Sequence, residues 1–303
     1  MDMRRELLGI ALVLFIGVCF ALANTFAGLA YQGGSDPLSV STARFVLPTA
    51  VLLIILLVRK QRILLPRRDG IAAAALGVVT VVYTWALLTA IDILPVPLAV
   101  LIFYLFPVFT SFILAGLGWE RMRPIAVGAA VIAFAGLALA LGVSGQGLNL
   151  VGVGLGIVAA IGLATVSAVS SRVIRSGDPR QATLYMAATA LVTFLVITSI
   201  HGDFALPQTD AGWWGFAGSN IFYAIAMIGF FVGISMIGPA KTTLFSYIEP
   251  IATIGAAFVL LGQVLLPLQS VGVLIVVGAL VIAGIAGTRR KAPPADQAHC
   301  AGK

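Results

Sequence analysis

Residues 96–117, VPLAVLIFYLFPVFTSFILAGL, form an uncharged apolar stretch that indicates the fold class of the chain. A helix of about 20 apolar residues is long enough to cross a bilayer core of about 30 Å. The stretch is far longer than the strand of a membrane barrel and shows no strict alternation of apolar and polar residues. It therefore predicts a transmembrane helix.

Similar runs occupy most of the remaining chain, and ten can be counted in all. They lie at residues 7–30, 37–58, 70–90, 96–117, 124–142, 152–174, 181–200, 213–236, 240–261 and 268–287. Of the 303 residues, 60% are hydrophobic and 10% are charged, against about 25% charged in an average soluble domain. This composition excludes a soluble enzyme, a disordered chain and a disulfide-stapled secreted module. The sequence predicts an all-α polytopic membrane protein with ten transmembrane helices.

The charges between the runs predict how the chain is oriented. If the N-terminus is cytoplasmic, every Lys and Arg except Arg44 falls on the cytoplasmic side. The opposite connections, near residues 31–37, 91–95, 143–151, 201–212 and 262–267, contain no Lys or Arg. This asymmetry follows the positive-inside rule and places both termini in the cytoplasm. Topology accounts for the net charge of +7, so no nucleic-acid partner is expected.

The two halves of the chain resemble each other. A shift of 143 residues aligns YLFP at residues 104–107 with YIEP at residues 247–250, and Pro124 with Pro267. The chain is therefore predicted to contain two five-helix repeats, residues 1–142 and 152–288, followed by a polar cytoplasmic tail, residues 289–303. Because five is odd, the second repeat should be inverted in the membrane. Inverted repeats are typical of secondary transporters, which bind substrate near the midplane between the repeats.

This arrangement resembles the EamA family of the drug/metabolite transporter superfamily. Short motifs support the resemblance: NTF at residues 24–26, DP at 36–37, ARF at 43–45 and GWER at 118–121. The resemblance implies a multi-pass exporter or importer of small metabolites in the bacterial inner membrane, driven by a gradient. The absence of a GxxxxGK[ST] phosphate-binding loop from the sequence agrees with that. One departure is Gln263, where family members often carry a second glutamate equivalent to Glu120, so a symmetric role for the two positions is in doubt.

Two charged residues, Arg44 and Glu249, lie well inside the predicted spans. Burying a charge in a bilayer costs about 2.5–3.5 kcal/mol on insertion scales, so each needs an explanation. Glu249 could carry a coupling proton, bind a cationic group of the substrate, or pair structurally with Arg44 or Lys241. Arg44 could bind a substrate carboxylate, or its long side chain could reach outward to Asp36 or to lipid phosphate.

Other residues are candidates for a central cavity. At 100° per residue, a polar stripe on the ninth span contains Thr242, Ser246, Glu249 and Thr253. The equivalent face of the fourth span is largely aromatic and contains Ala99, Phe103, Phe106 and Thr110. Asn24, Tyr83, Tyr104, Asn220 and Tyr223 could line the cavity or hydrogen-bond between helices.

Two prolines and one glutamate are candidates for moving parts. Pro107 and Pro250 should kink their spans, as hinges or as static bends. Glu120 could act as a gate, or simply end its helix in solvent.

These features favour a secondary transporter over an enzyme, because the spans contain no histidine and one central carboxylate. No metal or cofactor is expected. A polar wall facing an aromatic wall suits an amphipathic solute, such as an amino acid or another zwitterion, or a vitamin or flavin. The sequence leaves open an uncoupled facilitator, the direction of transport, the coupling ion (a proton is one candidate), and whether the chain is a monomer or a homodimer.

Overall fold

The structure is a computed structural model that describes residues 3–61, 63–119, 124–142, 149–173, 179–201, 204–237, 242 and 245–288. All regular secondary structure within these residues is helical. The helices are α1 (Met3–Gln32), α2 (Pro37–Arg44), α3 (Val46–Val58), α4 (Arg67–Ile93), α5 (Val96–Phe103), α6 (Phe106–Gly116), α7 (Pro124–Gly142), α8 (Leu150–Val173), α9 (Pro179–His201), α10 (Asp210–Ile237), α12 (Ile248–Leu261) and α13 (Pro267–Thr288).

Six stretches of the described chain are long and apolar enough to cross a membrane. They are Glu6–Gln32, Pro37–Val58, Arg67–Ile93, Val96–Gly116, Leu150–Val169 and Arg180–Ile200. Two shorter apolar helices, Ile248–Leu261 and Pro267–Ala279, add to these. The all-helical class is as predicted, whereas the number of ten transmembrane helices stays a prediction.

Prolines interrupt two of the long apolar stretches. A proline lacks the N–H that would bond to the carbonyl four residues earlier, so a helix breaks or bends near it. Helix α2 ends at Arg44, four residues before Pro48, and α3 begins at Val46. In the same way α5 ends at Phe103, four residues before Pro107, and α6 begins at Phe106. Each stretch is therefore a pair of helices.

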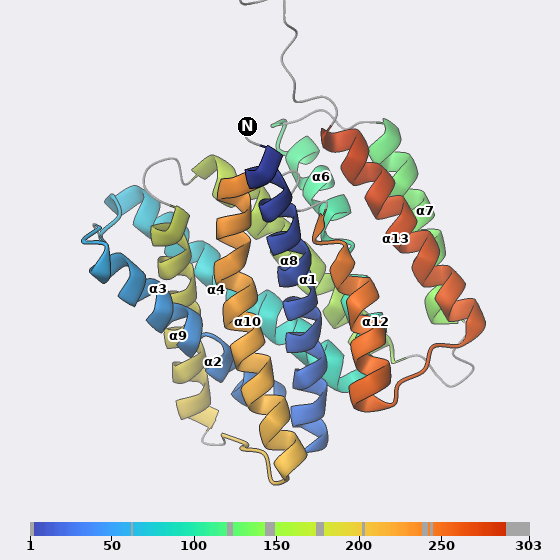
Figure 1. Cartoon of the computed structure of the whole chain (residues 1–303), viewed down its shortest axis with the longest axis horizontal. Coiled ribbons are helices and arrows are strands. Elements are labelled where there is room, and N and C mark those ends of the chain that lie inside the picture. Colours follow the sequence, from blue (N-terminus) through green and yellow to red (C-terminus); the bar gives the residue numbers. More distant parts are fainter. Residues whose placement is uncertain are drawn as a thin grey trace, which may run out of the picture.

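The helices pack as a bundle around α1 (Figure 1). Helix α1 lies along α10 and also contacts α12, so the first helix of the chain packs against helices from its second half. Helix α4 packs against α8 and α9 in the same way. Helices α7 and α13 lie side by side at one edge of the bundle (Figure 1).

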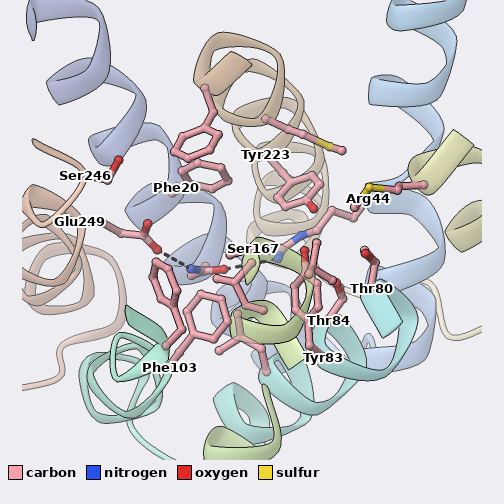
Figure 2. A pocket seen from close by; sticks show the side chains of 18 of the residues that line it. Phe20, Arg44, Thr80, Tyr83, Thr84, Phe103, Ser167, Tyr223, Ser246 and Glu249 are labelled. Atoms are coloured by element: carbon pink, nitrogen blue, oxygen red, sulfur yellow. Dashed lines mark hydrogen bonds between the residues drawn. The ribbon is translucent and has the colours of Figure 1, made fainter. Parts of the chain in front are cut away.

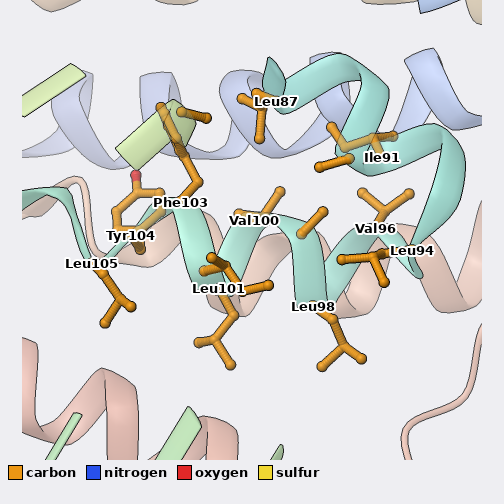
Figure 3. Packing of buried hydrophobic residues seen from close by; sticks show 14 of the residues in the cluster. Leu87, Ile91, Leu94, Val96, Leu98, Val100, Leu101, Phe103, Tyr104 and Leu105 are labelled. Atoms are coloured by element: carbon orange, nitrogen blue, oxygen red, sulfur yellow. The ribbon is translucent and has the colours of Figure 1, made fainter. Parts of the chain in front are cut away.

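The first half of the stretch that predicts the fold class lies in the interior. All eight residues of α5 are buried, and Tyr104 and Leu105 after it are buried too. Figure 3 shows their side chains packed with Leu87 and Ile91 near the end of α4 and with Leu94 directly after it. Because lipid is as apolar as these side chains, their contribution to stability is close packing.

One end of the bundle is closed by contacts between the two halves of the chain. We call this end the acidic side, because the connections there are predicted to carry Asp and no Lys or Arg, and the opposite end the basic side. On the acidic side the Gln208 N–H donates to the Gly33 carbonyl at 2.8 Å, and the Ser35 hydroxyl to the Ala205 carbonyl at 2.9 Å. Gly33 approaches the backbone of Gly212 so closely that a Cβ would clash.

A glutamine joins the halves a second time on the acidic side. The Val96 N–H, at the start of α5, donates to Gln263 Oε1 at 3.0 Å. Gln263 follows the C-terminus of α12, so this bond connects the fourth predicted span to the ninth. Gln263, the residue at which the sequence departs from the family pattern, therefore has a hydrogen-bond partner in the other half of the chain.

Candidate functional site

A cavity of about 380 Å³ lies inside the bundle, within the size range of small-molecule sites. Helices from both halves of the chain line it. Its aromatic residues are Phe20, Tyr83, Phe103, Tyr104, Phe106, Tyr223 and Phe230. Its polar residues are Asn24, Arg44, Thr80, Thr84, Thr110, Ser167, Thr183, Ser246 and Glu249. The cavity is thus a mainly aromatic chamber that contains one cation and one carboxylate.

A single amide connects the two charges. Asn24 Nδ2 donates to Glu249 Oε1 at 3.1 Å, and Arg44 Nη1 donates to Asn24 Oδ1 at 3.3 Å. All three side chains are at most 4% exposed. In the described structure no hydrogen bond or ion pair joins Arg44 directly to Glu249. The two residues are therefore partners only through Asn24, an arrangement that α1 provides by passing between α2 and α12.

The second oxygen of Glu249 is held by a residue from the first half. The Tyr104 hydroxyl lies 2.6 Å from Glu249 Oε2 and 3.0 Å from the Ser246 carbonyl oxygen. The Glu249 N–H also donates to this carbonyl at 3.0 Å, whereas Pro250 has no N–H to offer it, so Tyr104 is its second donor. The Tyr104 and Tyr247 rings also meet edge to face, with centroids 6.1 Å apart. The two repeated motifs, YLFP and YIEP, thus contact each other at the cavity wall.

Arg44 is held by contacts on several sides. Its Nη2 donates to the Ala23 carbonyl at 3.1 Å and to the Ser219 hydroxyl at 3.0 Å. Its guanidinium carbon lies 4.8 Å from the centre of the Tyr223 ring, a cation–π distance. Asp36, the outward partner considered above, instead caps α2 by accepting from the Ser39 N–H. Arg44 therefore points into the bundle and not toward the acidic side.

The charges lie on opposite sides of the cavity. Figure 2 shows Glu249 near Phe103 and Phe20 on one side, and Arg44 beside Tyr223, Tyr83 and Thr84 on the other. The Tyr83 and Phe103 rings stack at 6.3 Å between these two regions. A ligand in the cavity would meet a cationic end, an aromatic middle and a carboxylate end.

The cavity lining comes from both ends of the bundle. Thr183, in the first half of α9, and Phe230, in the second half of α10, belong to half-helices that lead to the basic side. Asn24 and Leu87, in the second halves of α1 and α4, belong to half-helices that lead to the acidic side. Two hydrogen bonds described above, from Gln208 to Gly33 and from Val96 to Gln263, close the acidic side.

The structure brings most of the predicted site residues together. Those that line the cavity are Asn24, Arg44, Tyr83, Phe103, Tyr104, Phe106, Thr110, Tyr223, Ser246 and Glu249. Four others do not line it: Ala99, Thr242, Thr253 and Asn220. Thr253 donates back to the Glu249 carbonyl at 2.8 Å, and Asn220 donates to the Phe216 carbonyl of its own helix at 2.8 Å. Glu120 and Lys241 lie outside the described residues.

The expected polar stripe on the ninth span is not one continuous helical face. Helix α12 begins at Ile248, and Ser246 and Tyr247 form a turn before it. A spacing of 100° per residue does not extend across that turn, so Thr242 and Glu249 do not share a wall. Pro250 explains the break, because it cannot donate to the Ser246 carbonyl.

Sequence reasoning missed the small hydroxyl residues of the lining, namely Thr80, Thr84, Ser167 and Thr183. Thr80 and Thr84 are four residues apart on α4, so they share one helix face. That spacing inside an apolar span is the signal that could have identified them. No group of three or more His, Cys, Asp or Glu side chains lies together within the residues that the structure describes.

An all-helical bundle with membrane-length apolar helices and a central cavity defines a class of multi-pass membrane proteins that handle small molecules. The sequence model of the EamA-like transporter family matches residues 7–142 and again residues 150–285. The chain therefore belongs to the EamA-like transporter family, within the drug/metabolite transporter superfamily. It is a membrane transporter of small molecules.

Comparison with solved structures agrees with this fold. One crystal structure superposes with a TM-score of 0.64 over 92% of this chain and 98% of the other chain, at 20% sequence identity. At that identity the likeness shows the fold alone. None of the curated proteins compared with the chain is similar enough to count as a match.

Proposed function

We propose that this chain is a secondary active transporter of small amphipathic metabolites in the bacterial inner membrane. It works by alternating access between two inverted five-helix repeats, with ten transmembrane helices and both termini in the cytoplasm. The observation that carries the proposal is the cavity between the halves, with Arg44 and Glu249 joined through Asn24. Buried charges at membrane depth are costly, so they are expected to serve the transported solute or ion.

The closure of one side supports alternating access. Contacts between the halves close the acidic side of the bundle. With the orientation predicted by the positive-inside rule, this is an inward-facing state. The outward-facing state would break the acidic-side contacts and close the basic side.

Amino acids and related zwitterions are the first substrate candidates. Arg44 and Glu249 line opposite sides of the cavity and could meet a carboxylate and an amino group of one solute. A planar solute, such as a vitamin or a flavin, is the second candidate. The stacked Tyr83 and Phe103 rings favour it.

Glu249 is the proposed coupling residue. It is 4% exposed, and its two oxygens accept hydrogen bonds from Asn24 and Tyr104. A proton on this carboxyl would remove the negative charge that faces Arg44 across Asn24, and so would link protonation to the charge of the cavity. An uncoupled facilitator would use the same cavity without such a linkage.

Untargeted metabolite profiling tests the function. Cells expressing the wild type, Glu249→Gln or an empty vector are compared for metabolites in the cells and in the medium. The direction of any change distinguishes import from export. Glutamine has nearly the shape of glutamate and keeps an oxygen for Asn24, so the variant should insert normally. We expect its transport to fall by at least about tenfold.

Three results are distinguishable. A metabolite moved by the wild type and not by Glu249→Gln supports both the transporter and the role of Glu249. Equal movement by both makes Glu249 structural. If the wild type moves nothing in either direction, the proposal of active metabolite transport fails. Where the wild type does move a metabolite, a protonophore that collapses the proton gradient tests the coupling. A coupled carrier stops accumulating the solute, whereas a facilitator accumulates none with or without the gradient.

A further inference from the structure

The Arg44 side of the cavity has hydrogen-bond donors without acceptors. Arg44 is 1% exposed, and its Nε has no hydrogen-bond partner. A guanidinium carries five N–H donors and no acceptor. The contacts of Nη1 and Nη2 with Asn24, Ala23 and Ser219 fix the group in place without using Nε. No carboxylate touches the guanidinium in the described structure, so the positive charge lacks a directly bonded anion.

Thr84 supplies a second donor at the same side of the cavity. Its hydroxyl is buried and has no hydrogen-bond partner. One turn earlier Thr80 donates to the Leu76 carbonyl at 2.9 Å, which is the usual partner of a threonine inside a helix. Thr84 departs from that arrangement: its hydroxyl does not bond to its own helix, and the Tyr83 side chain is its polar neighbour. Both Arg44 and Thr84 line the cavity, and Figure 2 shows them on the side opposite Glu249.

The Glu249 side of the cavity differs in this respect. Both carboxylate oxygens already accept a bond, one from Asn24 and one from Tyr104. Of the two charged groups, the one that still lacks a hydrogen-bond partner is therefore Arg44, whose Nε needs an acceptor. A buried cation that lacks an anion in contact is costly, and a carboxylate matches the guanidinium fork best among small organic acceptors.

We propose that Arg44 and Thr84 form a carboxylate subsite, and that the substrates are small organic carboxylates with an apolar body. Both donor atoms are covered in the described structure, so on binding Arg44 Nε and the Thr84 hydroxyl would turn toward the cavity and donate to the carboxylate, while the body would lie against the Tyr83–Phe103 stack. An amino group is not required, because Glu249 is already bonded. The inference rests on the proposed function, and narrows its substrates from zwitterions and planar solutes in general to carboxylates.

A ligand series with one carbon skeleton tests the subsite without requiring transport. The protein in lipid nanodiscs is titrated with 3-phenylpropionate, phenylalanine, 3-phenylpropylamine and 3-phenylpropanol, and binding is followed by thermal stability and calorimetry. We expect the two carboxylates to bind at least about tenfold more tightly than the amine and the alcohol. Equal binding of the amine or the alcohol, or no binding of either carboxylate, overturns the subsite.

Paired threonine variants provide the matched control. Thr84→Val keeps the side-chain shape and removes the hydroxyl, and it should weaken carboxylate binding by about three- to tenfold. Thr89→Val removes another buried hydroxyl without a partner from α4, but Thr89 does not line the cavity. Its affinity should equal that of the wild type. A loss of affinity that is the same in both variants overturns the assignment of Thr84.

Arg44→Lys keeps the charge and removes the fork, so it should weaken the carboxylates further than Thr84→Val does. If that variant fails to insert, the threonine pair still decides the question. If the protein binds carboxylates but moves no solute in vesicles, the subsite is supported and the proposed transport function is contradicted. If it moves only solutes that have no carboxylate, the transport function is supported and the subsite is contradicted.

Discussion

At the scale of single residues, Asn24 determines how the two buried charges share the cavity. An amide offers one acceptor oxygen and two donor hydrogens, so it can accept from Arg44 and donate to Glu249 at once. A carboxylate could not donate to Glu249, and an aliphatic side chain could do neither. Asn24 also belongs to α1, which packs against both α10 and α12, so the bridge connects distant parts of the chain.

Replacing Asn24 by leucine should destabilise the protein by about 2 kcal/mol, because it leaves Arg44 Nη1 and Glu249 Oε1 without these partners. The measurement is thermal unfolding in detergent. Asn220→Leu is the matched control. Asn220 is also buried, but it donates only within its own helix to the Phe216 carbonyl, and its loss should cost less than about 1 kcal/mol. Equal destabilisation by the two variants would contradict the importance of the bridge.

At the scale of helices and turns, prolines and a glutamine set the shape of the cavity and its closure. Pro250 offers no N–H to the Ser246 carbonyl, which accepts instead from the Glu249 N–H and the Tyr104 hydroxyl, and Pro107 separates α5 from α6 next to the same tyrosine. The breaks in the two repeats therefore meet at Tyr104 and Glu249. Gln263 closes the acidic side by bonding to the first residue of α5.

Pro250→Ala tests whether the break at α12 is a hinge. Alanine restores an N–H that competes with Tyr104 for the Ser246 carbonyl, so the helix should straighten and transport should slow by about tenfold while the protein stays folded. Pro267→Ala is the control, since Pro267 begins α13, where a proline replaces no helical hydrogen bond. Transport at the wild-type rate in Pro250→Ala would make the break a static bend.

Gln263→Ala should loosen the acidic side, because it removes the bond to the Val96 N–H between the halves. A distance distribution between spin labels on the acidic-side ends of α5 and α12 should shift toward longer distances. Gln263→Glu retains an acceptor oxygen and should restore the wild-type distribution. Gln269→Ala removes a comparable bond, to the Leu266 N–H within one connection, and should leave the distances unchanged. A shift of the same size in Gln269→Ala would exclude a specific role for Gln263.

The sequence predicted the all-helical class and most of the residues expected to line a cavity, but not how these residues are joined. Apolar runs predicted the helices, and the repeat identified Tyr104, Glu249 and their prolines as special. The bridge from Arg44 to Glu249 could not be predicted, because Asn24 lies 225 residues from Glu249 in the chain. Thr242 was expected beside Glu249 because helical spacing was extended across a turn. Thr84 was missed because a lone hydroxyl in an apolar span usually bonds to its own helix.

At the scale of the whole molecule, the two halves are interleaved around one cavity. Helices α1 and α4 from the first half pack on α10, α12, α8 and α9 from the second, so neither half encloses the cavity alone. Closure on the acidic side corresponds to one end state of the proposed carrier. The predicted orientation decides which compartment that end state faces.

Reporter fusions at the C-terminus test the orientation. Following the positive-inside rule, a green fluorescent protein fused there should fluoresce and an alkaline phosphatase should be inactive, since phosphatase requires export to fold. Fusions in the connection at residues 143–151 should give the opposite result. Active phosphatase at the C-terminus would reverse the predicted orientation, and the described state would then face outward.

Access to the cavity from each side of the membrane tests the central claim most directly. In a background with Cys19→Ala and Cys300→Ser, Ser167→Cys places a single thiol in the cavity wall. A membrane-impermeant maleimide should label it rapidly in inside-out vesicles and slowly in spheroplasts, and Gln263→Ala should speed labelling from outside. Val131→Cys, exposed on α7 away from the cavity, controls for labelling through the lipid. Equal rapid labelling of Ser167→Cys from both sides, or none from either, would contradict an alternating-access cavity.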